Sequence, residues 1–193
     1  MSVAVGLSIG AAAVSTAAVV YQSKGDTFTF SKGVQPRLED NGSPSEIASL
    51  KQRSKTLIES GNLMSNIKPS AQKAIGEDPD SPAGRKLQSD LEKVWVPQKA
   101  EEYFNDIVSM FRMENGMALD QTFEKGEFVV QEWQGVQVDG SQALVRVIGH
   151  WESRKGSQLT QDALTQWTLT LEKETQGGRW LMVDRVGVVL EGR

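Results

Sequence analysis

The chain has no cysteine and only one histidine, His150, among its 193 residues. Without cysteine, disulfide bonds, thiolate metal sites and a cysteine nucleophile are all excluded. A single histidine likewise excludes a histidine-rich metal site, and no spacing of Asp and Glu indicates a calcium or magnesium site. The sequence therefore predicts no metal, no cofactor and no catalytic residue.

Dense clusters of basic residues are also missing. Lys and Arg number 21 against 25 Asp and Glu, which gives a net charge of −4 with both signs mixed along the chain. Proteins that bind nucleic acid usually present a basic face to the phosphate backbone. We therefore expect no direct nucleic-acid partner.

Charge is absent from the first part of the chain. Residues 2–21 contain no charged side chain, and as a helix they would span about 30 Å, the thickness of a bilayer core. Gly6 and Gly10 form a small-xxx-small pair of the kind that lets two membrane helices pack closely. We interpret residues 1–23 as a hydrophobic, transmembrane segment. A removed targeting segment, a buried part of a soluble fold and a misassigned start are the alternatives.

Residues 24–45 are polar and contain Gly, Pro and Ser, which predicts a linker. Within it, the alternating "TFTF" could pair as an edge strand. The folded domain is expected over residues 46–193. Its first helix should begin near Glu46, capped by Ser43 or Ser45. After a break at residues 76–84, a second helical region over 85–114 should be kinked or broken at Pro97.

From residue 123 the period changes from helical to alternating, and four segments read as strands. Asp139-Gly140 predicts a tight hairpin between the first two, and residues 153–162 a longer polar loop between the second and third. Mid-strand glycines at 135 and 149 indicate bulges or sharp bends. The expected fold class is α+β, with N-terminal helices packed on a curved antiparallel sheet of about four strands.

The segment "QALVRVIGHWESR", residues 142–154, contains the one histidine. Alternation places His150 on the face with Arg146 and away from Trp151. No nucleophile motif lies nearby, so we interpret His150 as a surface or rim residue. Tryptophans 133, 151, 167 and 180 are interpreted as packing residues. Glu132, Asp162 and Asp184 are scattered, and their spacing forms no acid–base pair.

A family resemblance lies in residues 141–183, "SQALVRVIGHWESRKGSQLTQDALTQWTLTLEKETQGGRWLMV". This stretch resembles the C-terminal part of the single-span inner-membrane scaffold proteins of type IV secretion and conjugation systems. The matching residues are Trp151, Trp167, Leu169, Leu171 and Trp180. The resemblance implies a cone-like, nuclear transport factor 2-like domain. Membrane-anchored accessory proteins of lipid-import systems share this plan.

The resemblance also implies a function. It points to a non-catalytic scaffold subunit that is anchored through residues 2–21, self-associates and binds other subunits of a membrane complex. Its domain would be extracytoplasmic, although Lys24, Lys32, Arg37 and Lys51 after the hydrophobic run favour the cytoplasm by the positive-inside rule. The alternatives are a small-molecule binder or isomerase- or dehydratase-like enzyme that uses the interior of the cone, and an adaptor of another membrane-associated assembly.

Overall fold

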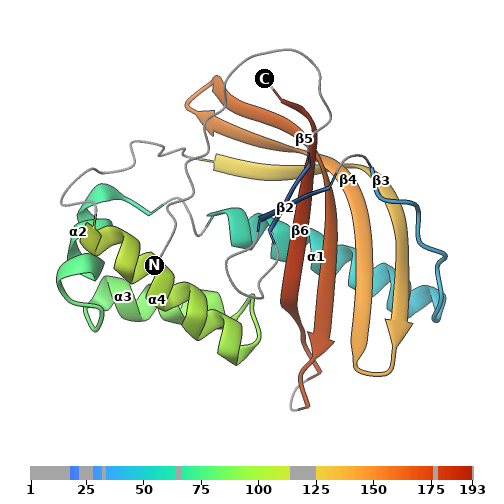
Figure 1. The fold of residues 1–193 in the computed structure, drawn as a ribbon, viewed down its shortest axis with the longest axis horizontal. Coiled ribbons are helices and arrows are strands. Elements are labelled where there is room, and N and C mark those ends of the chain that lie inside the picture. Colours follow the sequence, from blue (N-terminus) through green and yellow to red (C-terminus); the bar gives the residue numbers. More distant parts are fainter. Residues whose placement is uncertain are drawn as a thin grey trace.

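The computed structural model describes residues 18–21, 28–31, 34–63, 67–113, 125–175 and 178–192, and Figure 1 shows their α+β arrangement. The helices are α1 (Pro44–Leu63), α2 (Pro69–Glu77), α3 (Pro82–Glu92) and α4 (Pro97–Met113). The strands are β1 (Ala18–Tyr21), β2 (Phe28–Ser31), β3 (Lys125–Asp139), β4 (Gln142–Lys155), β5 (Gln158–Lys173) and β6 (Trp180–Gly192). The predicted fold class, helices on a curved antiparallel sheet, is confirmed.

Strands β3 to β6 form an antiparallel sheet in sequence order, and all four bend as they run (Figure 1). We call the face that packs on α1 the inner face. In β4 it carries Ala143, Val145, Val147 and Trp151, all buried. Arg146 and His150 alternate onto the opposite, outer face. The predicted division of this strand is confirmed, because the pleat places successive side chains on opposite sides.

Helix α1 packs on the inner face. Its first turn is capped by Ser43, whose Oγ accepts a hydrogen bond from the Glu46 N–H at 3.2 Å. This satisfies one of the N–H groups that the start of a helix leaves unpaired. Leu50, Leu57 and Ile58 of this helix are fully buried. The helix therefore contributes one side of the main core.

Helices α2, α3 and α4 pack on one another and connect to the sheet beside β6 (Figure 1). The helical region predicted over 85–114 is broken before Pro97, which cannot donate a backbone hydrogen bond within a helix. In the break, Val94 O accepts from Met182 N at 2.8 Å and Val96 N donates to Met182 O at 3.0 Å. These bonds form a parallel bridge along the edge of β6.

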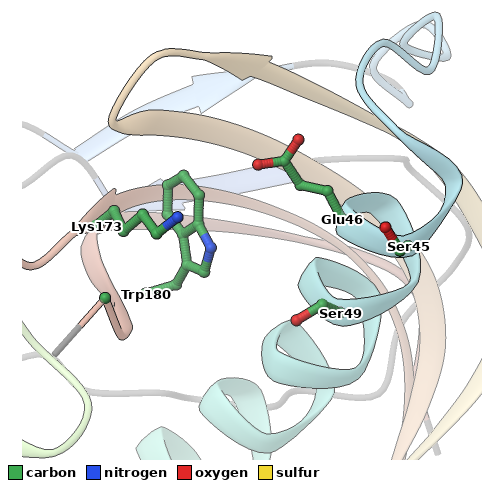
Figure 2. Close-up of a pocket in the computed structure, with 6 residues that line it drawn as sticks. Ser45, Glu46, Ser49, Lys173 and Trp180 are labelled. Carbon is green, nitrogen blue, oxygen red and sulfur yellow. The ribbon is translucent and has the colours of Figure 1, made fainter.

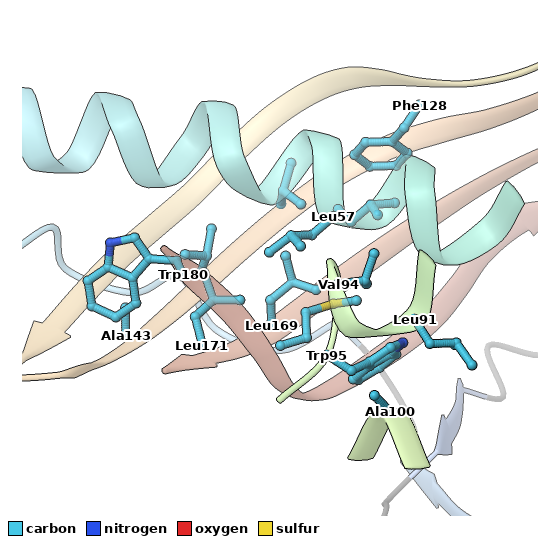
Figure 3. Close-up of a cluster of buried hydrophobic side chains, with 14 of the residues drawn as sticks. Leu57, Leu91, Val94, Trp95, Ala100, Phe128, Ala143, Leu169, Leu171 and Trp180 are labelled. Carbon is cyan, nitrogen blue, oxygen red and sulfur yellow. The ribbon is translucent and has the colours of Figure 1, made fainter. Parts of the chain in front are cut away.

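One hydrophobic core joins the helices to the sheet. Figure 3 shows side chains from α1, from the α3–α4 connection and from the strands converging on it. Trp95 lies at the junction, where its ring centroid is 4.5 Å from that of Tyr103. The Arg185 guanidinium lies 5.6 Å from the Trp95 ring and 5.3 Å from the Trp167 ring, within the range of cation–π attraction.

One prediction about the strands is wrong. Residues 153–162 do not form a long loop, because β4 runs to Lys155 and β5 begins at Gln158. Gly156, at φ +61°, forms the tight turn between them. The bulge expected at Gly149 lies on the facing strand, because Gly149 pairs with Val130 and the register of β3 shifts between Val130 and Glu132. A Cβ at Gly149 would lie 2.5 Å from Phe128 Cζ, so the glycine makes room for an aromatic ring.

The predicted hydrophobic helix lies mostly outside the described residues. Its last four residues, Ala18–Tyr21, form strand β1, which pairs with β2, Phe28–Ser31. This part of the prediction is wrong for the described residues, and the pairing supplies the reason, because both strands exchange backbone hydrogen bonds. The suggestion that "TFTF" pairs as a strand is confirmed for its last three residues, which lie in β2. No helix within the described ranges is long and apolar enough to cross a membrane.

The second half of the expected linker is part of the folded domain. Residues 34–41, which we call the strap, run beside β3 and lead into α1 (Figure 1). Leu38 N donates to Gln134 O at 2.7 Å, and Asn41 N donates to Val136 O at 3.0 Å. The strap was predicted as linker because its composition is polar, but its backbone groups find partners on the sheet.

Candidate functional site

The inner face of the sheet is filled by the protein's own side chains. Phe128, Val145, Leu169, Leu171 and Met182 are fully buried there against α1. The four strand tryptophans also belong to this packing: Trp151 and Trp180 are buried, and Trp133 and Trp167 pack against the core. Their interpretation as packing residues is confirmed. The interior that a cone-type enzyme uses for its substrate is occupied here by apolar groups.

His150 lies on the outer face and has a carboxylate partner. Its Nδ1 is 2.8 Å from Asp162 Oδ1, and both side chains are about one-third exposed. The strand register explains the contact, because Glu152 pairs with Asp162 and His150 is the adjacent outer-face residue of β4. This arrangement orients the imidazole and is one component of a general-base site.

The other two carboxylates singled out in the sequence lie in separate interactions. Glu132 forms an ion pair with Arg37 of the strap. Asp184 Oδ1 accepts a hydrogen bond from Arg185 N at 2.8 Å. Glu132 and Asp162 thus have different partners, and the structure does not join either of them to Asp184 in an acid–base pair.

A buried polar cluster, which no pattern in the sequence indicated, lies on the outer face beneath the strap. Its centre is Gln166 of β5, which is only 1% exposed. Gln166 Oε1 accepts from Gln35 N at 2.8 Å, and its Nε2 donates to Gln35 O at 3.0 Å and to Gln134 Oε1. The side-chain amide therefore pairs with the strap backbone as a neighbouring strand would.

Arg146 extends this cluster along β4. It is 7% exposed, and its guanidinium donates to Pro36 O of the strap and to Thr168 Oγ1, the latter at 3.0 Å. Burial removes water from the charged form and lowers the pKa of Arg146 below its usual value. The arginine remains a donor that is held in place by neutral oxygen acceptors.

The edge of β3 completes the contact surface for the strap. Val136 N donates to Asp40 Oδ1 at 2.7 Å, and Val138 N donates to Asn41 Oδ1. Between them and the cluster, Gly135 lies at φ +120° in the predicted bulge. A Cβ at Gly135 would be 2.3 Å from Leu38 O, so only glycine lets the strap approach so closely. We call Gln134–Val138, Arg146 and Gln166 the cradle.

An open depression of about 300 Å³ lies where α1 begins, next to the β5–β6 hairpin (Figure 2). Its lining residues are Ser45, Glu46, Ser49, Lys173, Gly178 and Trp180. The Lys173 amine lies 5.6 Å from the centre of the Trp180 ring. In the same hairpin, hydrogen bonds from Arg179 lower the pKa of Glu174. The depression therefore presents both signs of charge around one indole.

Some signals for these sites were present in the sequence and others were not. Gly135 was a detectable one, since a glycine inside a strand indicates a bulge or a close approach of backbone. Gln35 and Gln166 are 131 residues apart, and neither belongs to a motif. The His150–Asp162 pair was hidden by the loop that we expected over residues 153–162.

Neither a metal site nor a similar known protein indicates the function of this chain. Among the described residues, no three or more His, Asp or Glu side chains gather where they could hold a metal ion. The chain matches no protein-family model, no curated protein sequence and no solved structure.

Proposed function

We propose that this chain is a non-catalytic, membrane-anchored assembly subunit of a multiprotein complex. Its domain is of the nuclear transport factor 2-like kind, and the complex is a type IV secretion or conjugation machine. The uncharged N-terminal run holds the chain at the membrane, and the domain, on the extracytoplasmic side, binds other subunits and further copies of itself. Tethering raises the local concentration, so weak contacts between domains suffice.

The observation that carries this proposal is the filled inner face. Enzymes and binders of cone-like fold hold their ligand in a hollow between helices and sheet. Here Leu50, Leu57 and Phe128 occupy that space with no exposed surface. Function is then assigned to the outside of the domain, which is where a subunit of a larger assembly makes its contacts.

The outer surface offers apolar side chains for such contacts. Val129 lies opposite His150, and Leu159 lies opposite Arg154 near the turn between β4 and β5. Both apolar side chains are more than one-third exposed. Apolar groups ringed by polar ones are typical of surfaces that bind other proteins.

The test uses the full chain in its own cells. Membrane fractionation combined with protease digestion from each side should find the chain in the membrane and its domain cleaved only from the extracytoplasmic side. After gentle extraction it should migrate as part of a large complex. Val129→Asp and Leu159→Asp should release it from the complex, and Gln158→Asp, an exposed neighbour, should not. A chain that is monomeric and free of the membrane would refute the proposal.

A small-molecule role is the alternative, and one feature favours it. The depression beside Trp180 holds Glu46 and Lys173 at its rim (Figure 2). A zwitterionic ligand such as a free amino acid matches this pair of charges. Quenching of Trp180 fluorescence by amino acids, abolished in Lys173→Ala, would support this role, and an unchanged signal would exclude it for this class of ligand.

A further inference from the structure

The cradle recognises an extended chain through its backbone. Gln166 bonds both the N–H and the C=O of Gln35, and Arg146 bonds the C=O of Pro36. The β3 carbonyls of Gln134 and Val136 accept from the strap N–H groups. Recognition of this kind is how a sheet edge accepts an added strand.

The strap is held mainly by polar contacts. Val34 at its start is 51% exposed, and Leu38 is only partly buried. Hydrogen bonds to a strap are exchanged for bonds to water when it leaves, so their net contribution is small. Segments with few buried apolar side chains open more readily than the core around them.

A hinge separates the strap from the rest of the domain. Gly42 lies at φ +111°, directly before Ser43, which caps α1. Helix α1 is fixed independently by Leu50 and Leu57. Strands β2 and β1 precede the strap, and β1 packs beside β6. A change of the Gly42 dihedral angles would therefore carry these two strands away together with the strap and leave the helix in place.

We propose that two copies of the chain exchange straps, so that residues 34–41 of each copy occupy the cradle of the other. The occupant is a second copy because the same segment already fits the cradle within one chain. The exchange is reciprocal and closes as a two-fold dimer. The inference deepens the proposed function by naming the contact through which the assembly subunit self-associates.

The absence of cysteine makes a direct test possible. One preparation of the full chain, in detergent, carries only Gln35→Cys and another only Gln166→Cys. The two are mixed at high concentration, warmed to allow exchange and then oxidised. Exchange predicts a disulfide-linked dimer containing one chain of each kind. Glu39→Cys, at an exposed strap position, replaces Gln35→Cys in the control and should give no such product.

Light scattering of the unmodified chain provides a second measurement that does not depend on the cysteine variants. Gly42→Ala disfavours the closed turn and should tighten the dimer by about tenfold or more, because residues with a Cβ avoid positive φ. Gly140→Ala changes another positive-φ turn, where no atom lies within 4 Å of an added Cβ, and should leave the dimer unchanged.

A chain that stays monomeric in both experiments, with no mixed disulfide, would overturn the exchange. Retention of the larger membrane complex by that same chain would show that strap exchange fails while the assembly function stands. A mixed disulfide in a chain that belongs to no larger membrane complex would show that strap exchange occurs while the proposed assembly function fails.

Discussion

The two faces of the β3–β6 sheet are closed by different kinds of interaction. The inner face is covered by α1 through fully buried apolar groups such as Leu57 and Phe128. Part of the outer face is covered by the strap, through hydrogen bonds to Gln166 and Arg146. Apolar burial stabilises strongly and without directional demands, whereas hydrogen bonds stabilise modestly and specify one geometry. The inner face thus contributes most of the stability of the fold, and the outer face holds the strap in one geometry.

The largest contrast should come from two adjacent residues of β3. Phe128 points inward and is 0% exposed, and Val129 points outward and is 40% exposed. Phe128→Ala should lower the free energy of unfolding by about 3–5 kcal/mol, through lost burial and the cavity left behind. Val129→Ala should change it by less than about 0.5 kcal/mol. Urea unfolding of both variants measures the difference, and equal effects would contradict the assignment of faces.

Gly135 should be the most sensitive position of the cradle. Gly135→Ala should destabilise the domain by about 3 kcal/mol, because the added Cβ meets Leu38 O and φ is positive. Gly140 also has positive φ, but no atom lies within 4 Å of an added Cβ. Gly140→Ala should therefore cost only about 1 kcal/mol from backbone strain. The difference between the melting temperatures of the two variants measures the effect of the close contact between Gly135 and the strap. Similar melting temperatures would contradict this contact.

The central amide of the cradle should act on the strap more than on the core. Gln166→Ala removes the side-chain amide that bonds the Gln35 N–H and C=O groups and should cost about 2 kcal/mol. Hydrogen exchange should accelerate at the amides of Gln35 and Leu38 and stay slow at Leu169. Gln158→Ala, at an exposed position of the same strand, should change neither rate. Equal acceleration in strap and core would mean that the two faces unfold together.

The smallest effect is expected at His150 and Asp162, whose side chains are about one-third exposed. Ion pairs in contact with solvent contribute between about 0.2 and 1 kcal/mol. A double-mutant cycle with His150→Gln and Asp162→Asn should give a coupling energy in this range. A coupling several times larger would indicate a desolvated, functional pair and would reopen the possibility of catalysis on the outer face.

The sequence predicted those parts of the fold that local patterns determine. Alternation identified the inner face of β4, and Ser43 and Pro97 marked where helices begin and break. The strap could not be predicted, because its partners are backbone groups and glutamines that are distant in the chain. The contact between His150 and Asp162 depends on the register between β4 and β5, which is set by the two-residue turn between them. This turn could not be predicted, because the sequence around it is polar on both faces of the strands and shows no alternation of polar and apolar residues.

The segments that bond the two edge strands of the sheet, β3 and β6, affect the solubility of the chain. The Leu38 and Asn41 amides bond β3, and Val94 and Val96 bond Met182 on β6. Unpaired strand edges act as templates on which further chains stack into fibrils, and natural sheets protect them. A strap that left β3 without a replacement would expose such a template. Reciprocal exchange refills the edge as it is vacated, which would keep the chain from amyloid-like aggregation while copies join.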